Sequence, residues 1–99
     1  MLPRGLLARA AWHRYEERYA EAYQDLHEVL EIAESGGMRL YLVDYHIEMA
    51  RLLQVAGGEL SESFKLSESW KSWEQHKAEA LRLIGETGYK RRLKEAEAL

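Results

Sequence analysis

The sequence predicts an all-α fold made of tandem antiparallel helical hairpins, with a short C-terminal capping helix over about residues 89–98. Leu, Ala, Glu and Arg dominate the composition and favour helices, while strand-favouring runs of Val, Ile and Thr are almost absent. Apolar residues recur at spacings of three and four, as they do on one face of a helix. The pairs Gly36-Gly37 and Gly57-Gly58 follow such stretches and indicate helix ends. The 99 residues are expected to form one domain.

The first hairpin is predicted over about residues 3–35. Pro3 suits the first turn of a helix, where its missing N–H costs little. A second helix is predicted from the clean apolar stripe between Tyr19 and Ala33. Residues 13–20, which separate the two helices, contain neither Gly nor Pro. The sequence therefore also allows one long helix from Pro3 to Glu34.

The second hairpin is predicted over about residues 38–86. Its first helix, Met38 to Ala56, carries apolar residues on several sides, which is typical of a helix that lies between neighbours. We expect it to be the central and most buried element. A loop is predicted at residues 57–69, because this segment begins with the second Gly-Gly pair and is rich in Ser and Glu. Ser67 or Ser69 is expected to cap the following helix.

Composition excludes several classes of function. The formal charge is −3, from 14 basic and 17 acidic residues, whereas nucleic-acid-binding domains usually carry a basic face. The absence of cysteine rules out disulfides and thiolate chemistry. No apolar run approaches the roughly 18 residues of a membrane-spanning helix, and residues 1–11 have the character of a helix start, not of a signal peptide. We expect a cytoplasmic protein that binds neither nucleic acid nor membrane.

The polar residues do not form a pattern that indicates catalysis or metal binding. None of the histidines forms the i, i+4 pair that builds a metal site on a helix. Asp44, His46 and Glu48 are the densest cluster, but residues two apart point in different directions on a helix. We interpret this cluster as a polar contact between helices. No activated nucleophile is recognisable, and most carboxylates have Lys or Arg in helical register. We therefore expect no enzymatic activity, metal or cofactor.

Three stretches resemble a known family. The segment Tyr19–Ala33, with Ala22 as the small residue and Leu26 four positions on, resembles the second helix of a tetratricopeptide repeat. The stretches 37–52 and 83–92 resemble the terminal tetratricopeptide-like repeats of large bacterial signalling ATPases. The usual Gly is missing from the first hairpin turn, the predicted loop is longer than a repeat needs, and the chain has no phosphate-binding Gly-Lys-Ser/Thr loop.

The resemblance implies a groove lined by the first helix of each hairpin. The residues expected to bind a partner are Arg4, Leu7, Arg14, Tyr15, Tyr41, Tyr45 and Glu48. Ala11, Met38 and Met49 fall on the same groove-lining face. The implied function is a protein-interaction module that holds a peptide or helix of a partner protein. The alternative is a self-assembling structural unit that forms a homodimer, since repeat arrays bury their faces only by stacking. The two chains could exchange helices through the Gly-less hinge at Glu16 to Arg18.

Overall fold

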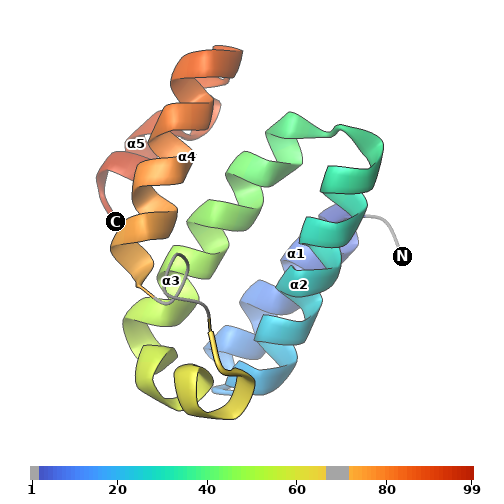
Figure 1. The fold of residues 1–99 in the computed structure, drawn as a ribbon, viewed down its shortest axis with the longest axis vertical. Helices are drawn as coiled ribbons and strands as arrows, with labels where there is room; N and C mark the ends of the chain where they lie inside the picture. The colour runs from blue at the N-terminus through green and yellow to red at the C-terminus, as the bar shows by residue number, and fades with distance from the viewer. Residues whose placement is uncertain (1–2, 67–71) are drawn as a thin grey trace.

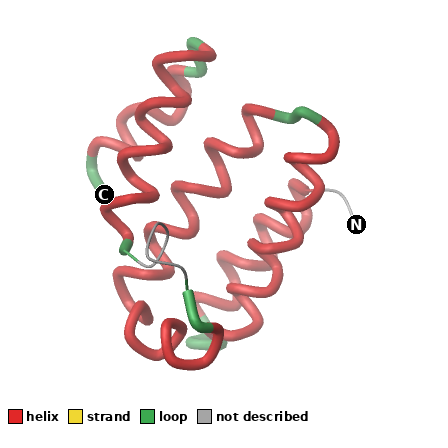
Figure 2. The backbone as a smooth tube through the Cα atoms, viewed as in Figure 1, coloured by secondary structure: helices red, strands yellow, loops and turns green. Residues whose placement is uncertain are grey.

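The computed structural model describes residues 3–66 and 72–99, and helices make up most of both ranges (Figures 1 and 2). No strand occurs within these two ranges, so the all-α prediction is confirmed. The elements are α1 (Pro3–Tyr15), α2 (Tyr19–Gly36), α3 (Arg39–Phe64), α4 (Trp73–Thr87), a 3₁₀ turn (Lys90–Arg92) and α5 (Leu93–Glu97). None of the helices in the described ranges has the length and apolar character needed to cross a membrane.

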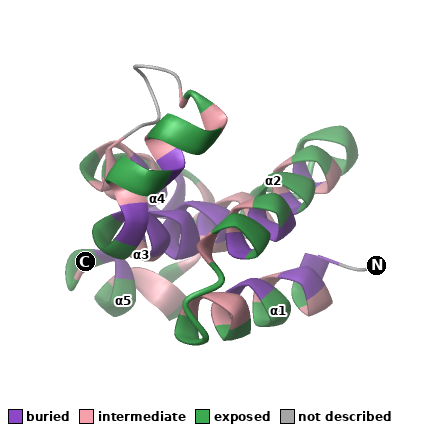
Figure 3. Ribbon diagram, turned by 90° about the horizontal axis from the view of Figure 1, so that it is seen from below, coloured by how far each residue is buried: buried purple, intermediate pink, exposed green. Residues whose placement is uncertain are grey.

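Helix α3 is the central element of the arrangement. It packs against α1 and α2 on one side and against α4 on the other, and α5 follows α4 (Figures 1 and 3). Its burial on several sides agrees with the apolar residues that the sequence places around it. The side chains of α3 therefore separate into two sets, one for each half of the molecule.

Two distinct apolar clusters form the core. The first joins α1, α2 and α3, and contains Leu6, Leu26 and Leu52 among its fully buried residues. The second joins α3, α4 and α5, and contains Ile47 and Ala96. Fully burying one large aliphatic side chain stabilises a fold by about 1.5–3 kcal/mol, so each cluster is a substantial source of stability. The two clusters use opposite faces of α3.

The turn between α1 and α2 takes the place of the continuous helix that the sequence allowed. Helix α1 ends at Tyr15, and the backbone N–H of Arg18 donates to the carbonyl of His13 at 2.7 Å. Glu17 adopts the left-handed conformation with φ = 62°. This conformation costs a residue with a side chain roughly 1–2 kcal/mol, which is why Gly is usual at such a turn. The hairpin therefore forms at the cost of local strain at Glu17.

The predicted loop at residues 57–69 is wrong over its first part. Helix α3 continues to Phe64, and the chain bends at Ala56, whose φ of −141° and ψ of 19° are not helical. The helix resumes because Leu60 is buried in the first cluster and Phe64 stacks on Tyr23, with ring centroids 4.3 Å apart. The apolar contacts beyond Gly57-Gly58 outweigh the weak helix preference of glycine, so the pair marks a bend and not an end.

Helix α4 begins with a capping box at Ser72. The Ser72 hydroxyl accepts a hydrogen bond from the Glu74 backbone N–H at 3.2 Å, and the Gln75 side-chain oxygen accepts one from the Ser72 N–H at 3.0 Å. These bonds satisfy backbone donors that a helix start leaves unpaired. The cap is therefore Ser72, and the expected caps Ser67 and Ser69 lie outside the described residues.

Candidate functional site

A groove of about 570 Å³ runs between α1 and the C-terminal segment, across the first part of α3. Three of its residues, Arg4, Leu7 and Tyr41, belong to the set expected from the sequence. The remaining residues come from the start of α3 and from the segment that folds back after α4. The lining as a whole is Arg4, Leu7, Leu40, Tyr41, Asp44, Tyr89, Arg91, Arg92 and Glu95.

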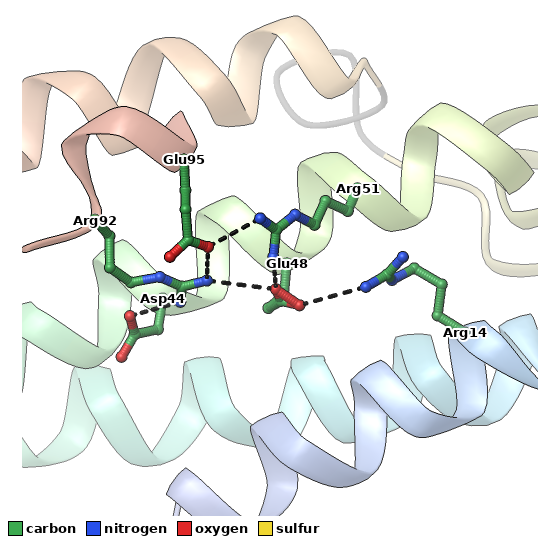
Figure 4. Close-up of polar contacts among 6 residues, drawn as sticks. All are labelled: Arg14, Asp44, Glu48, Arg51, Arg92 and Glu95. Atoms are coloured by element: carbon green, nitrogen blue, oxygen red, sulfur yellow. Dashed lines mark hydrogen bonds and ion pairs between the residues drawn. The ribbon is translucent and has the colours of Figure 1, made fainter. Parts of the chain in front are cut away.

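A network of ion pairs links α3 to the C-terminal side of the groove (Figure 4). The Arg92 guanidinium donates to Asp44 at 2.7 Å and to Glu95 at 2.8 Å, and it lies 3.6 Å from the Glu48 carboxylate. Because Asp44 and Glu48 are on α3, Arg92 ties the C-terminal segment to the central helix. The side chain of Arg92 is only 18% exposed.

The same network extends towards α1. Glu48, which is 7% exposed, accepts a hydrogen bond from Arg51 at 2.8 Å and pairs with Arg14 of α1 at 3.8 Å. Arg51 also donates to Glu95 at 2.9 Å. The six side chains in Figure 4 are therefore three arginines and three carboxylates, and their charges balance. A balanced, hydrogen-bonded set of this kind holds α1, α3 and α5 in fixed relative positions.

The pKa shifts of Arg92 and Glu95 favour the charged forms of these two groups. Burial alone would lower the pKa of the Arg92 guanidinium, but hydrogen bonds to Glu95 and Asp44 raise it above its ordinary value. The hydrogen bond from Arg92 lowers the pKa of the Glu95 carboxyl, and a second bond from Arg51 acts in the same direction. Near neutral pH these groups are ionised, so the pairs persist.

The structure separates the other expected groove residues from this lining. Glu48 and Arg14 belong to the ion-pair network. Tyr15 is 83% exposed at the end of α1 and does not line the groove. Tyr45 is 6% exposed, belongs to the first core cluster and does not line this groove. Residues four apart lie on nearly the same face of a helix, so the border between the groove and the first core cluster passes between Tyr41 and Tyr45.

The C-terminal residues of the groove were not predicted from the sequence. In the sequence, Tyr89, Arg91 and Arg92 belong only to the capping helix expected at about residues 89–98. Their position depends on α5 folding back towards α3, a contact between segments more than 40 residues apart, as the 48-residue separation of Arg92 and Asp44 illustrates. The available signal was that Leu93 and Ala96 can pack while Arg92 and Glu95 face the carboxylates and arginines of α3. Sequence spacing alone does not reveal which helix they meet.

A second polar contact lies on the opposite side of α3. His46 and His76 of α4 are both buried, and their Nδ1 atoms are 2.9 Å apart, a distance at which one imidazole donates a hydrogen bond to the other. His46 therefore turns away from Asp44 and Glu48, as the spacing of two residues predicted. Within residues 3–66 and 72–99, no group of three or more His, Asp or Glu side chains is placed to hold a metal ion.

No protein-family model, curated protein or solved structure significantly matches this chain. Its function is therefore argued from the groove and the network themselves.

Proposed function

We propose that this chain is a protein-interaction module, with two tetratricopeptide-like hairpins and a capping helix, that holds a peptide or helix of a partner protein. The groove is the single observation on which this proposal depends. It lies along α1 and α3, the first helices of the two hairpins, and these are the helices that line the groove in the resemblance stated above. The third wall comes from the segment after α4.

The composition of the groove supports binding to a protein surface. Leu40 is 49% exposed, and Tyr41 and Tyr89 are half-buried, so apolar and aromatic area is accessible to a ligand. Tyr and Arg are enriched at interfaces because they combine contact area with hydrogen bonding. The ion-pair network fixes the helices that carry these side chains. A preformed site loses less conformational entropy on binding, which favours affinity.

Tyr41→Ala is expected to weaken binding without unfolding the domain. The probe is a peptide selected from a random dodecapeptide display library on the immobilised native chain, then synthesised with a fluorescent label. Truncating an aromatic side chain at the centre of a binding site commonly costs about 2 kcal/mol or more, which corresponds to roughly 30-fold in Kd. Fluorescence anisotropy measures the affinity, and circular dichroism measures the melting temperature.

Tyr15→Ala is the matched control, since this tyrosine is exposed on α1 outside the groove. It should leave the affinity within about twofold. Equal affinity of the Tyr41 variant and the native chain, or a library that yields no peptide above the bare support, would refute the proposed function.

Self-assembly is the second candidate, and a separate feature of the structure favours it. Trp12 and Tyr15 expose large aromatic surfaces beside the turn at Glu17, where the left-handed conformation strains the hairpin. Opening this turn into a continuous helix would release the strain and let α1 pair with a second chain.

Glu17→Gly tests the swapped dimer. Glycine adopts positive φ without the steric cost, so it should favour the closed hairpin and convert a swapped dimer to the 11.6 kDa monomer. Glu16→Gly is the control, because that residue does not adopt positive φ. Light scattering over a wide concentration range measures the mass. A native chain that is monomeric throughout would eliminate this candidate.

A further inference from the structure

We infer that the groove selects an acidic segment, with carboxylates placed on either side of an apolar or aromatic side chain. This inference rests on the proposed function and adds the chemistry of the partner. It follows from which charges of the groove are already used within the chain and which are available to a ligand.

The network leaves two arginines available. Arg92 is held by Asp44, Glu95 and the neighbouring Glu48, so it has little capacity to bind a further anion. Arg4 on α1 and Arg91 on the C-terminal segment also line the groove, and both are exposed. Neither forms an ion pair with another residue in the described ranges 3–66 and 72–99. The six-residue network is neutral, so Arg4 and Arg91 give this surface a net positive charge.

This local charge contrasts with that of the whole chain, which is −3. Arg4 comes from one wall of the groove and Arg91 from the other. Each guanidinium can donate paired hydrogen bonds to a carboxylate. An approaching acidic segment would be attracted to this surface and repelled by the more acidic remainder, which favours correct orientation on encounter.

The groove that holds these two arginines is also lined by apolar and aromatic side chains. Leu7 belongs to α1, Leu40 and Tyr41 to α3, and Tyr89 to the C-terminal segment. Their accessible area suits an apolar or aromatic ligand side chain. The matching ligand is therefore a short segment with Glu or Asp flanking Leu, Phe or Tyr.

Two other occupants fit the observations less well. A nucleic-acid strand presents a run of phosphates, and two available arginines are few for a contact whose affinity comes from many neutralised phosphates. A second copy of this chain carries the same net charge of −3 and is repelled at long range. Both remain as outcomes of the experiment.

The experiment compares three forms of the full chain: native, Arg4→Gln with Arg91→Gln, and a control with Arg39→Gln and Arg82→Gln. The control removes two arginines that lie outside the groove. Both pair with Glu86 of α4. Each form is used to select from the random dodecapeptide library. The best native-selected peptide is then measured by fluorescence anisotropy in about 0.05 M and about 0.5 M salt.

The native chain should enrich peptides of net negative charge that contain Leu, Phe or Tyr. The groove variant should bind the selected peptide roughly fivefold to tenfold more weakly in low salt, with a smaller difference in high salt. The control should stay within about twofold of the native chain.

Enrichment of neutral or basic peptides, or equal weakening by both double variants, would overturn the acidic-segment inference while leaving the proposed function intact. Failure to enrich any peptide would instead count against the proposed function itself. Equal affinity for a single-stranded oligothymidylate would assign the groove to anions in general. Concentration-dependent dimerisation that is abolished only in the groove variant would assign it to a second copy of the chain.

Discussion

Arg92→Met should lower the free energy of unfolding by about 2–4 kcal/mol, because it removes the cation around which the ion-pair network is built. Asp44 and Glu48 would remain largely shielded from water, with the Arg92 partner gone and like charges close together. Methionine keeps much of the apolar length of the arginine stem, so the effect reports mainly on charge and hydrogen bonding. Urea unfolding followed by circular dichroism measures it.

The neighbouring residue provides the control for this change. Arg91 is exposed and belongs to the same turn, so Arg91→Met should change the free energy of unfolding by less than about 0.5 kcal/mol. Adding Asp44→Asn to Arg92→Met should restore part of the loss, since Arg92 is the arginine that pairs with Asp44, whereas Glu48 keeps Arg51 and Arg14. If Arg92→Met is no more destabilising than Arg91→Met, the network does not hold the C-terminal segment on α3.

Stability should fall by about 2 kcal/mol between pH 7 and pH 5 because of the buried histidine pair. Burial, followed by the charge of neighbouring His76, lowers the pKa of His46 from 6.5 to about 3, while Glu79 opposes this shift and Arg82 adds to it. Between these two values the unfolded chain binds a proton that the folded chain does not. The contribution is therefore fully present above pH 6.5 and is lost progressively as the pH falls.

His46→Leu with His76→Leu should flatten this dependence. Replacing both members of a hydrogen-bonded pair by apolar side chains of similar size leaves no buried donor or acceptor of that pair unsatisfied. His27→Gln is the control, since His27 is exposed on α2 and should leave the slope unchanged. Urea unfolding at half-unit steps from pH 7 to pH 5 measures the slope, above the range in which most carboxylates titrate. An unchanged slope in the double variant would assign the pH dependence to other groups.

The sequence was informative where one helix carried its own signal. The apolar stripe of α2 and the apolar residues on several sides of α3 predicted their existence and the central place of α3. Local signals failed where distant packing decided the outcome. Gly57-Gly58 indicated the end of the helix, but α3 continues to Phe64 because Leu60 is buried and Phe64 stacks on Tyr23. The strained turn at Glu17 also had no local signature, because the residue that usually marks it is absent.

The groove was predictable only in part for the same reason. Arg4, Leu7 and Tyr41 follow from the positions of a repeat pattern on α1 and α3. The same pattern placed Tyr45 on the groove, because it does not specify how far α3 rotates between its neighbours. Predicting the C-terminal wall would require knowing that Arg92 pairs with Asp44. The periodicity within either segment does not indicate this contact.

The division of the core into two clusters has a consequence for how the molecule fluctuates. Since α3 is the element common to both, opening of the segment from α4 onward as a sub-global unit would withdraw the partly buried Trp73 from the first cluster but leave that cluster's buried residues on α1, α2 and α3 together. The groove would vanish in that opened form, because one of its walls belongs to the departing segment. A ligand that binds both Arg4 and Arg91 would therefore stabilise the contact between α1–α3 and the segment from α4 onward. Amide hydrogen exchange in α4 and α5 would slow as ligand occupancy rises. The exchange rates of the C-terminal helices would therefore report binding in the groove beside α1.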